Sequence, residues 1–111
     1  DDAWPASDAL PPAAFVGEAV VVDVSELDGE IFYDALAEAA TRQRVALPGA
    51  ARLLLRTGRT IAGGRFPDAW PWLTPDCVRA LARGGLALLG VDAPSVDARD
   101  SRALDTHRAL F

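Results

Sequence analysis

An apolar run at residues 86–91 places the strongest constraint on how this chain can fold. It carries no charged side chain and is bounded by glycines, which is the pattern of a strand buried on both faces. Residues 19–24 and 52–56 contain similar apolar runs, the first rich in the β-branched residues that favour strands. Three continuous apolar strands predict a sheet with a parallel core.

The segments between these runs are long enough for parallel crossovers. Residues 30–44 predict a helix with one apolar face. Residues 74–83 predict a second helix, in which Thr74 is the N-cap and Pro75 occupies the first helical position. A parallel crossover needs about 10–12 residues, and both connections exceed this length. The sequence therefore predicts an α/β fold in which β/α/β layers surround a parallel core.

Length and charge limit the classes of function. The 111 residues amount to one domain, and 16 acidic against 11 basic side chains give a net charge of −5. This charge argues against a nucleic acid or an anionic membrane as partner, because both need clustered positive charge. No apolar run approaches the ~20 residues of a membrane span. The single cysteine excludes an internal disulfide and fits a reducing compartment, so we expect a cytoplasmic location.

The sequence does not start as a newly translated chain normally does. The sequence has no methionine and begins with an aspartate, before which an initiator methionine is not removed efficiently. We therefore expect residues 1–111 to be a single partial α/β domain from a longer protein. Residues 1–12 contain several prolines and predict an irregular arm, in which we expect Trp4 to pin onto the core.

Polar side chains follow the last apolar run. Asp92 comes first, and a segment dense in Asp, Ser and Arg then leads to the only histidine, His107. In open α/β sheets, ligands bind just beyond the carboxyl ends of the strands, so we expect the site here. Asp23 and Thr57 come at the ends of the other two strands and should lie at the same edge as Asp92.

These residues are compatible with several kinds of functional site. His107 follows Asp105 by two positions, and a nearby aspartate can orient a metal-ligating imidazole through its other nitrogen. Three alternatives stay open: a surface or capping histidine, a Ser–His–Asp arrangement with Ser95 or Ser101, and a hard-cation site of carboxylates. The carboxylates also fit a solvated loop with side-chain turns; they are Asp92, Asp97, Asp100 and Asp105.

The connection 57–73 is unusually long for a loop and contains Trp70 and Trp72 on either side of a proline. These indoles could line a substrate pocket, since long loops often carry function. Packing in the core or covering a neighbouring subunit is the alternative. Cys77, in the second predicted helix, reads as a small buried apolar side chain.

Residues 90–107, GVDAPSVDARDSRALDTH, are similar to a segment of the bacterial kynurenine formamidases (arylformamidases) of the metal-dependent cyclase superfamily. The family pattern runs Gly-Ile/Val-Asp-Thr/Ala-Pro-Ser-Leu/Val-Asp, then Asp/Glu-Ser-Lys/Arg-x-Leu/Met-Asp-Ala/Thr-His. LLLRTG at 53–58 and LTPDCVRALARGGLALLGVD at 73–92 also resemble this family. The resemblance covers the whole chain, as a fragment that lacks both ends of the family's domain.

This resemblance implies a β/α/β fold of the swivelling-domain type and a hydrolase that converts N-formyl-L-kynurenine to L-kynurenine and formate in tryptophan catabolism. It implies a small-molecule substrate, zinc or manganese as cofactor, and a homodimer. It also implies that His107 is a metal ligand. Beside it we expect four residues that orient the ligand or line the pocket, namely Asp92, Ser95, Asp97 and Asp105.

The chain departs from the family pattern in three ways. The family's main metal motif, approximately His-x-Gly-x-His-x-Asp-x-Pro, lies before the position of Asp1, and a glutamate ligand lies beyond the last residue. The family often has a second histidine directly after the first, where this chain has Arg108. We therefore expect the chain alone to be inactive. A degenerate, non-catalytic binding or assembly module of the same fold is one alternative; an unrelated small-molecule-binding domain with a pocket beside Asp92 and Trp72 is another.

Overall fold

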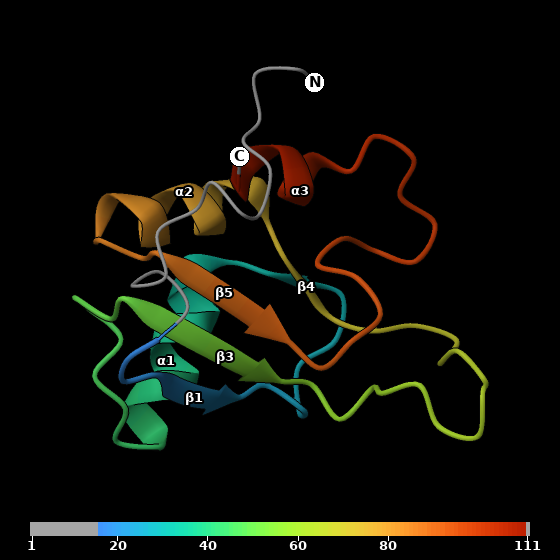
Figure 1. Cartoon of the computed structure of the whole chain (residues 1–111), viewed down its shortest axis with the longest axis horizontal. Helices are drawn as coiled ribbons and strands as arrows, with labels where there is room; N and C mark the ends of the chain where they lie inside the picture. Colours follow the sequence, from blue (N-terminus) through green and yellow to red (C-terminus); the bar gives the residue numbers. More distant parts are fainter. Residues whose placement is uncertain (1–15, 111) are drawn as a thin grey trace.

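The computed structural model describes residues 16–110, which fold around a three-stranded parallel sheet. Figure 1 shows the three arrows side by side and pointing in one direction. The middle strand is β3, and the strands are β1 (Val20–Asp23), β3 (Arg52–Arg56) and β5 (Leu88–Val91). The predicted α/β class and the parallel core are confirmed.

Helices pack against this sheet through an aliphatic core. They are α1 (Tyr33–Arg42), α2 (Pro75–Arg83) and α3 (Asp105–Leu110). Leu36 of α1 and Val78 of α2 are fully buried against Leu53 and Leu55 of β3, while α3 adds partly buried apolar side chains. Burying a Leu or Val side chain stabilises a fold by about 1.5–3 kcal/mol, so this face of the sheet holds the described elements together.

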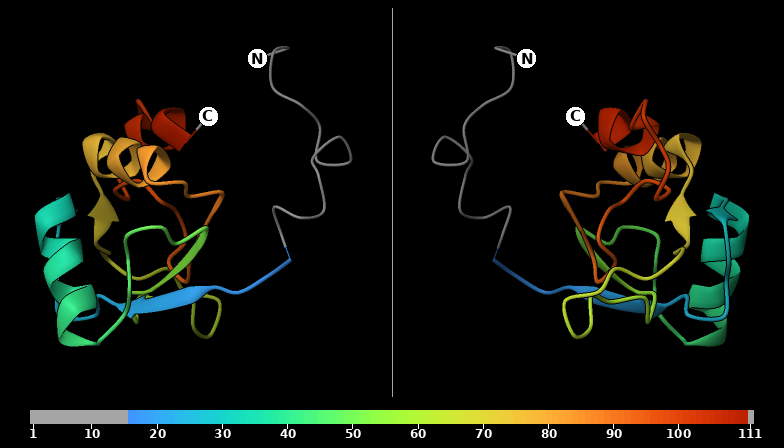
Figure 2. Two further views of the ribbon diagram at one scale, coloured as in Figure 1. Left: turned by 90° about the vertical axis from the view of Figure 1, so that its left-hand side faces the viewer. Right: turned by 90° about the vertical axis from the view of Figure 1, so that its right-hand side faces the viewer.

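The two faces of the sheet differ in exposure. Leu53 and Leu55 are buried, whereas Leu54 between them is 39% exposed. Val21 of β1, in register with Leu54, is 51% exposed. Within residues 16–110 the described helices pack on the face of Leu53 and Leu55 and lie on one side of the sheet (Figure 2), so the other face is open at β1 and β3. The strand predicted to be buried on both faces is β5, and all four of its residues are partly buried.

A second, smaller sheet joins the starts of two helices. Strands β2 (Glu30–Ile31) and β4 (Trp72–Leu73) pair in parallel, and α1 and α2 follow them within two residues. The helix predicted over 30–44 therefore begins only at Tyr33, because its first residues pair with β4. Likewise, the connection 57–73 ends in a strand. Strands of two residues are too short for side-chain periodicity to detect.

The start of α2 follows the sequence prediction. Thr74 is the N-cap, its side chain accepts a 3.1 Å hydrogen bond from Cys77 N, and Pro75 is in the first turn. The helix gives way to Gly84 and to Gly85, whose φ of 100° a residue with a side chain rarely adopts. The helix therefore ends at these glycines, and the chain continues into β5.

Helix α3 was not expected from the sequence, which is predominantly polar before it. The predicted arm at 1–12 and the packing of Trp4 lie outside the described residues. Across residues 16–110, the helices are too short and too polar for any of them to cross a lipid bilayer.

Candidate metal-ligand site

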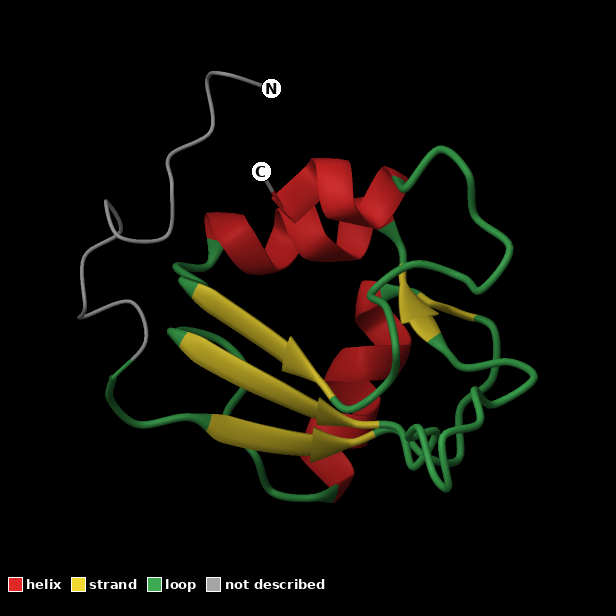
Figure 3. Ribbon diagram, turned by 45° about the vertical axis from the view of Figure 1, so that its right-hand side comes forward, coloured by secondary structure: helices red, strands yellow, loops and turns green. Residues whose placement is uncertain are grey.

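The carboxyl edge of the sheet carries a clamp built on Asp92. The backbone N–H and the Oγ1 hydroxyl of Thr57 donate to Asp92 Oδ1 at 2.8 and 2.6 Å, and Gly58 N donates to Oδ2 at 3.1 Å. Thr57 follows β3 and Asp92 follows β5, where loops leave the strand tips (Figure 3). Asp23 ends β1, and its Oδ2 lies 3.7 Å from Nη1 of Arg56 in β3. The expectation that these residues share one edge is confirmed.

We predict that Asp92→Ala destabilises the fold by about 2 kcal/mol near neutral pH, because it leaves the buried Thr57 N–H and hydroxyl without an acceptor. Partial burial raises the pKa of Asp92, but hydrogen bonds from Thr57 and Gly58 outweigh it and hold the pKa below its usual range. A lowered pKa stabilises the fold above the ordinary carboxyl pKa of about 3.9, and this contribution is lost as pH falls through the lower folded value.

Urea unfolding from pH 7 to pH 2.5 measures both effects. The difference between wild type and Asp92→Ala should shrink below about pH 4. Asp100→Ala, an exposed aspartate in the same loop, is the control and should change stability little. An equal loss in both variants would contradict the clamp.

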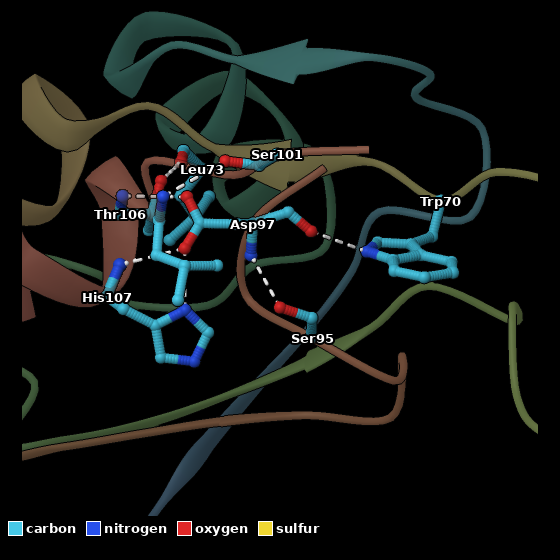
Figure 4. Close-up of polar contacts among 8 residues, drawn as sticks. Trp70, Leu73, Ser95, Asp97, Ser101, Thr106 and His107 are labelled. Carbon is cyan, nitrogen blue, oxygen red and sulfur yellow. Dashed lines mark hydrogen bonds and ion pairs between the residues drawn. The ribbon is translucent and has the colours of Figure 1, made fainter. Parts of the chain in front are cut away.

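A second polar cluster joins the loop after β5 to helix α3. The carboxylate of Asp97 accepts hydrogen bonds from Thr106 N at 2.7 Å and from His107 N at 3.0 Å, and His107 Nδ1 lies 2.6 Å from its Oδ2 (Figure 4). Asp97 is only 3% exposed. A buried carboxylate thus contacts both the backbone and the imidazole of the histidine.

Asp97 acts as a long-range cap for the start of α3. A helix leaves its first N–H groups without intrahelical partners, and Asp97 accepts two of them, from Thr106 and His107. The Thr106 hydroxyl donates to Leu73 O of β4 at 2.6 Å, and Thr106 is 1% exposed. Leu104, just before the helix, has a left-handed φ of 53°. The short α3 is therefore positioned by tertiary contacts more than by its own sequence.

The donor and the acceptor in the contact between Asp97 and His107 can be assigned. Burial raises the pKa of Asp97, but hydrogen bonds from His107 and Thr106 outweigh it and hold the pKa below its usual range. The carboxylate is therefore charged near neutral pH and can accept a hydrogen bond from Nδ1–H. A neutral imidazole in this contact carries its proton on Nδ1 and has a free lone pair on Nε2. With its side chain 40% exposed, His107 can present that lone pair to a ligand.

Two further contacts hold the backbone of Asp97. Ser95 Oγ accepts from Asp97 N at 3.1 Å, and Trp70 Nε1 donates to Asp97 O at 2.8 Å. Trp70 is 4% exposed. The structure therefore places two of the expected residues, Ser95 and Trp70, around a third, Asp97.

The remaining candidates take no part in the hydrogen bonds between Asp97 and His107. Asp105 is exposed in the first turn of α3, and the carboxylate that contacts the ring is Asp97, ten residues before His107. Trp72 and Asp105 line a pocket of about 250 Å³ together with Asp97 and Thr106. Asp92 belongs to the clamp at the strand ends. Cys77 is buried, which confirms the prediction, and burial raises the pKa of its thiol to about 12, so it is no nucleophile near neutral pH.

The described residues fit only part of a site for the zinc or manganese that the resemblance implies. His107 with Asp97 fits one ligand together with the carboxylate that orients it. Within residues 16–110, however, no three His, Cys, Asp or Glu side chains gather closely enough to hold a metal. A zinc site needs three or four ligands, so the described residues fit one part of such a site and not the whole.

Comparison with known proteins gives the family. The Cyclase family model ("Putative cyclase") matches residues 2–98. The chain belongs to the cyclase family. This match includes Asp92 and Asp97 but ends before His107, so the contact between Asp97 and His107 is an observation independent of it.

Curated cyclase-family relatives share the name kynurenine formamidase. The protein from Salinibacter ruber is 39% identical over 109 residues, which cover 96% of this chain and 48% of that protein. The proteins from Bacillus cytotoxicus and Bacillus anthracis are 37% and 36% identical over 97 residues, which cover 87% of this chain and 43% of each relative. The chain thus spans about half the length of the curated relatives that it matches.

Proposed function

We propose that this chain is the central part of an arylformamidase that hydrolyses N-formyl-L-kynurenine to L-kynurenine and formate in tryptophan catabolism. Relatives with the name kynurenine formamidase, 36–39% identical, support this assignment. The observation that carries it is the buried Asp97 carboxylate 2.6 Å from His107 Nδ1. Metal-ligating histidines almost always donate their other ring N–H to such an acceptor.

His107 would hold a zinc or manganese ion through Nε2, since Nδ1 is engaged by Asp97. When bound, the metal lowers the pKa of water and so supplies a nucleophile for amide hydrolysis near neutral pH. The residues of this chain fix the tautomer and the direction of the imidazole. Because Thr106 N and His107 N also donate to Asp97, the carboxylate keeps its position without any metal.

We further propose that parts of the same domain outside residues 1–111 supply the remaining ligands. Relatives about twice as long support this proposal, as does the lack of a three-ligand group within residues 16–110. By the resemblance, the complete enzyme is a cytoplasmic homodimer that acts on a small molecule.

The isolated chain should bind metal poorly. After purification with zinc and removal of loosely held ions, we expect metal analysis to find well under one zinc per chain, because one protein ligand cannot hold zinc against water. The double variant His107→Ala/Cys77→Ser gives the background of non-specific zinc binding. A stoichiometric, tightly held zinc in the wild-type chain would overturn this proposal.

The second candidate is a degenerate, non-catalytic binding or assembly module. The missing three-ligand group within residues 16–110 also favours it. The reading frame upstream of Asp1 decides between the two: a His-x-Gly-x-His-x-Asp motif supports the enzyme, and a start codon supports the module. Assaying the product of the complete frame for release of L-kynurenine then tests the enzyme directly.

A further inference from the structure

Trp70 is a buried residue whose single polar side-chain atom, Nε1, donates a hydrogen bond to the loop that carries Asp97. We propose that Trp70 is a positioning residue: its indole N–H holds the Asp97 backbone and thereby sets the direction of the His107 imidazole. This inference rests on the proposed role of His107 as a ligand. It differs from the expectation that Trp70 lines a substrate pocket.

Asp97 is fixed on both sides of its Cα. Ser95 Oγ accepts from its N–H at 3.1 Å, and Trp70 Nε1 donates to its C=O at 2.8 Å. With both backbone groups held, the side chain leaves the loop in one direction, toward Thr106 and His107. Figure 4 shows Trp70 on one side of Asp97 and His107 on the other.

The indole suits this role chemically. Trp Nε1–H is a donor and never an acceptor, so it can pair with the Asp97 carbonyl but cannot rotate to accept a bond instead. With Trp70 and Asp97 only 4% and 3% exposed, water cannot easily replace this bond, and losing it would leave a buried carbonyl unsatisfied.

The local sequence holds Trp70 itself in place. Pro71 follows it, and a residue before proline is restricted to extended conformations. The chain then enters β4, where Leu73 O accepts from the Thr106 hydroxyl at 2.6 Å. The segment 70–73 therefore contacts both partners in the site, the loop through Asp97 and helix α3 through Thr106.

The test uses the fact that the chain has one histidine, so its imidazole nitrogens give an unambiguous long-range ¹H–¹⁵N spectrum. The chain is labelled with ¹⁵N-histidine and studied at alkaline pH, raised until the imidazole nitrogen shifts no longer change. Trp70→Phe keeps an aromatic ring and removes the N–H. Trp72→Phe is the matched control, because the Trp72 indole takes no part in the hydrogen bonds of Asp97.

In the wild type we expect the Nδ1–H tautomer to predominate. Trp70→Phe should lower the ratio of Nδ1–H to Nε2–H about fivefold, the factor expected for one lost hydrogen bond, whereas Trp72→Phe should change it less than twofold. An unchanged ratio in Trp70→Phe, or equal changes in both variants, would overturn the proposal. The amide spectrum checks that each variant is folded.

A measurement on the wild type covers the case in which Trp70→Phe does not fold. Hydrogen exchange of the Trp70 indole should be at least tenfold slower than that of Trp72; equal rates would overturn the proposal. Metal content of the complete enzyme separates this inference from the proposed function. If His107→Ala leaves that metal content unchanged while the tautomer still depends on Trp70, the ligand role fails and the positioning role survives.

Discussion

In the complete arylformamidase that we propose, replacing His107 by alanine should abolish formamidase activity and leave the fold intact. We expect turnover to fall at least about a thousandfold, because a catalytic metal lowers the activation free energy by several kcal/mol. The cost in stability should be small. The ring is 40% exposed, and the backbone N–H of residue 107 still donates to Asp97 in the variant.

Kinetics with N-formyl-L-kynurenine, together with metal content and urea unfolding of the same preparations, check this prediction. Arg102→Ala, an exposed change in the preceding loop, is the control and should keep full activity. Undiminished turnover in His107→Ala would remove this residue from the site.

Replacing Asp97 by alanine should be the most destabilising single change at the site. It removes the acceptor of two backbone N–H groups and of His107 Nδ1, and Asp97 is almost wholly buried. Breaking a buried, charged hydrogen-bond network costs about 3 kcal/mol. In the complete enzyme, losing the acceptor that orients a ligating histidine should also weaken metal binding about 10–100-fold.

Asp105→Ala is the matched control for this prediction. Asp105 is exposed in the first turn of α3, where a carboxylate contributes about 0.5 kcal/mol through the helix dipole. Urea unfolding of the 111-residue chain compares the two variants. Equal losses would mean that Asp97 does no more than an ordinary charge near the end of a helix.

The sheet and the two long helices could be predicted because their signals are local. The run 52–56 is a strand with the predicted bounds, and Thr74 and Pro75 begin a helix by capping chemistry alone. The open face around Val21 and Leu54 could not be predicted, since an apolar run does not say which elements cover it. The Salinibacter ruber relative is about twice as long as this chain.

The candidate site depended on contacts distant in sequence. Spacing drew attention to Asp105, two residues before His107, yet the ring contacts Asp97. The reason is the direction of the chain: Asp105 lies in the first turn of α3 and faces solvent, while the loop after β5 folds back to bring Asp97 under the start of the helix. Likewise, nothing in the spacing of Trp70 and Asp97 indicates that they are hydrogen-bonded.

The central claim is that Asp97 holds Nδ1 of His107 and so leaves Nε2 free to bind metal. The most direct test is the imidazole spectrum of the ¹⁵N-histidine-labelled chain at alkaline pH. We expect a proton on Nδ1 and a bare Nε2. A proton on Nε2 in the wild-type chain, with Nδ1 bare, would contradict it.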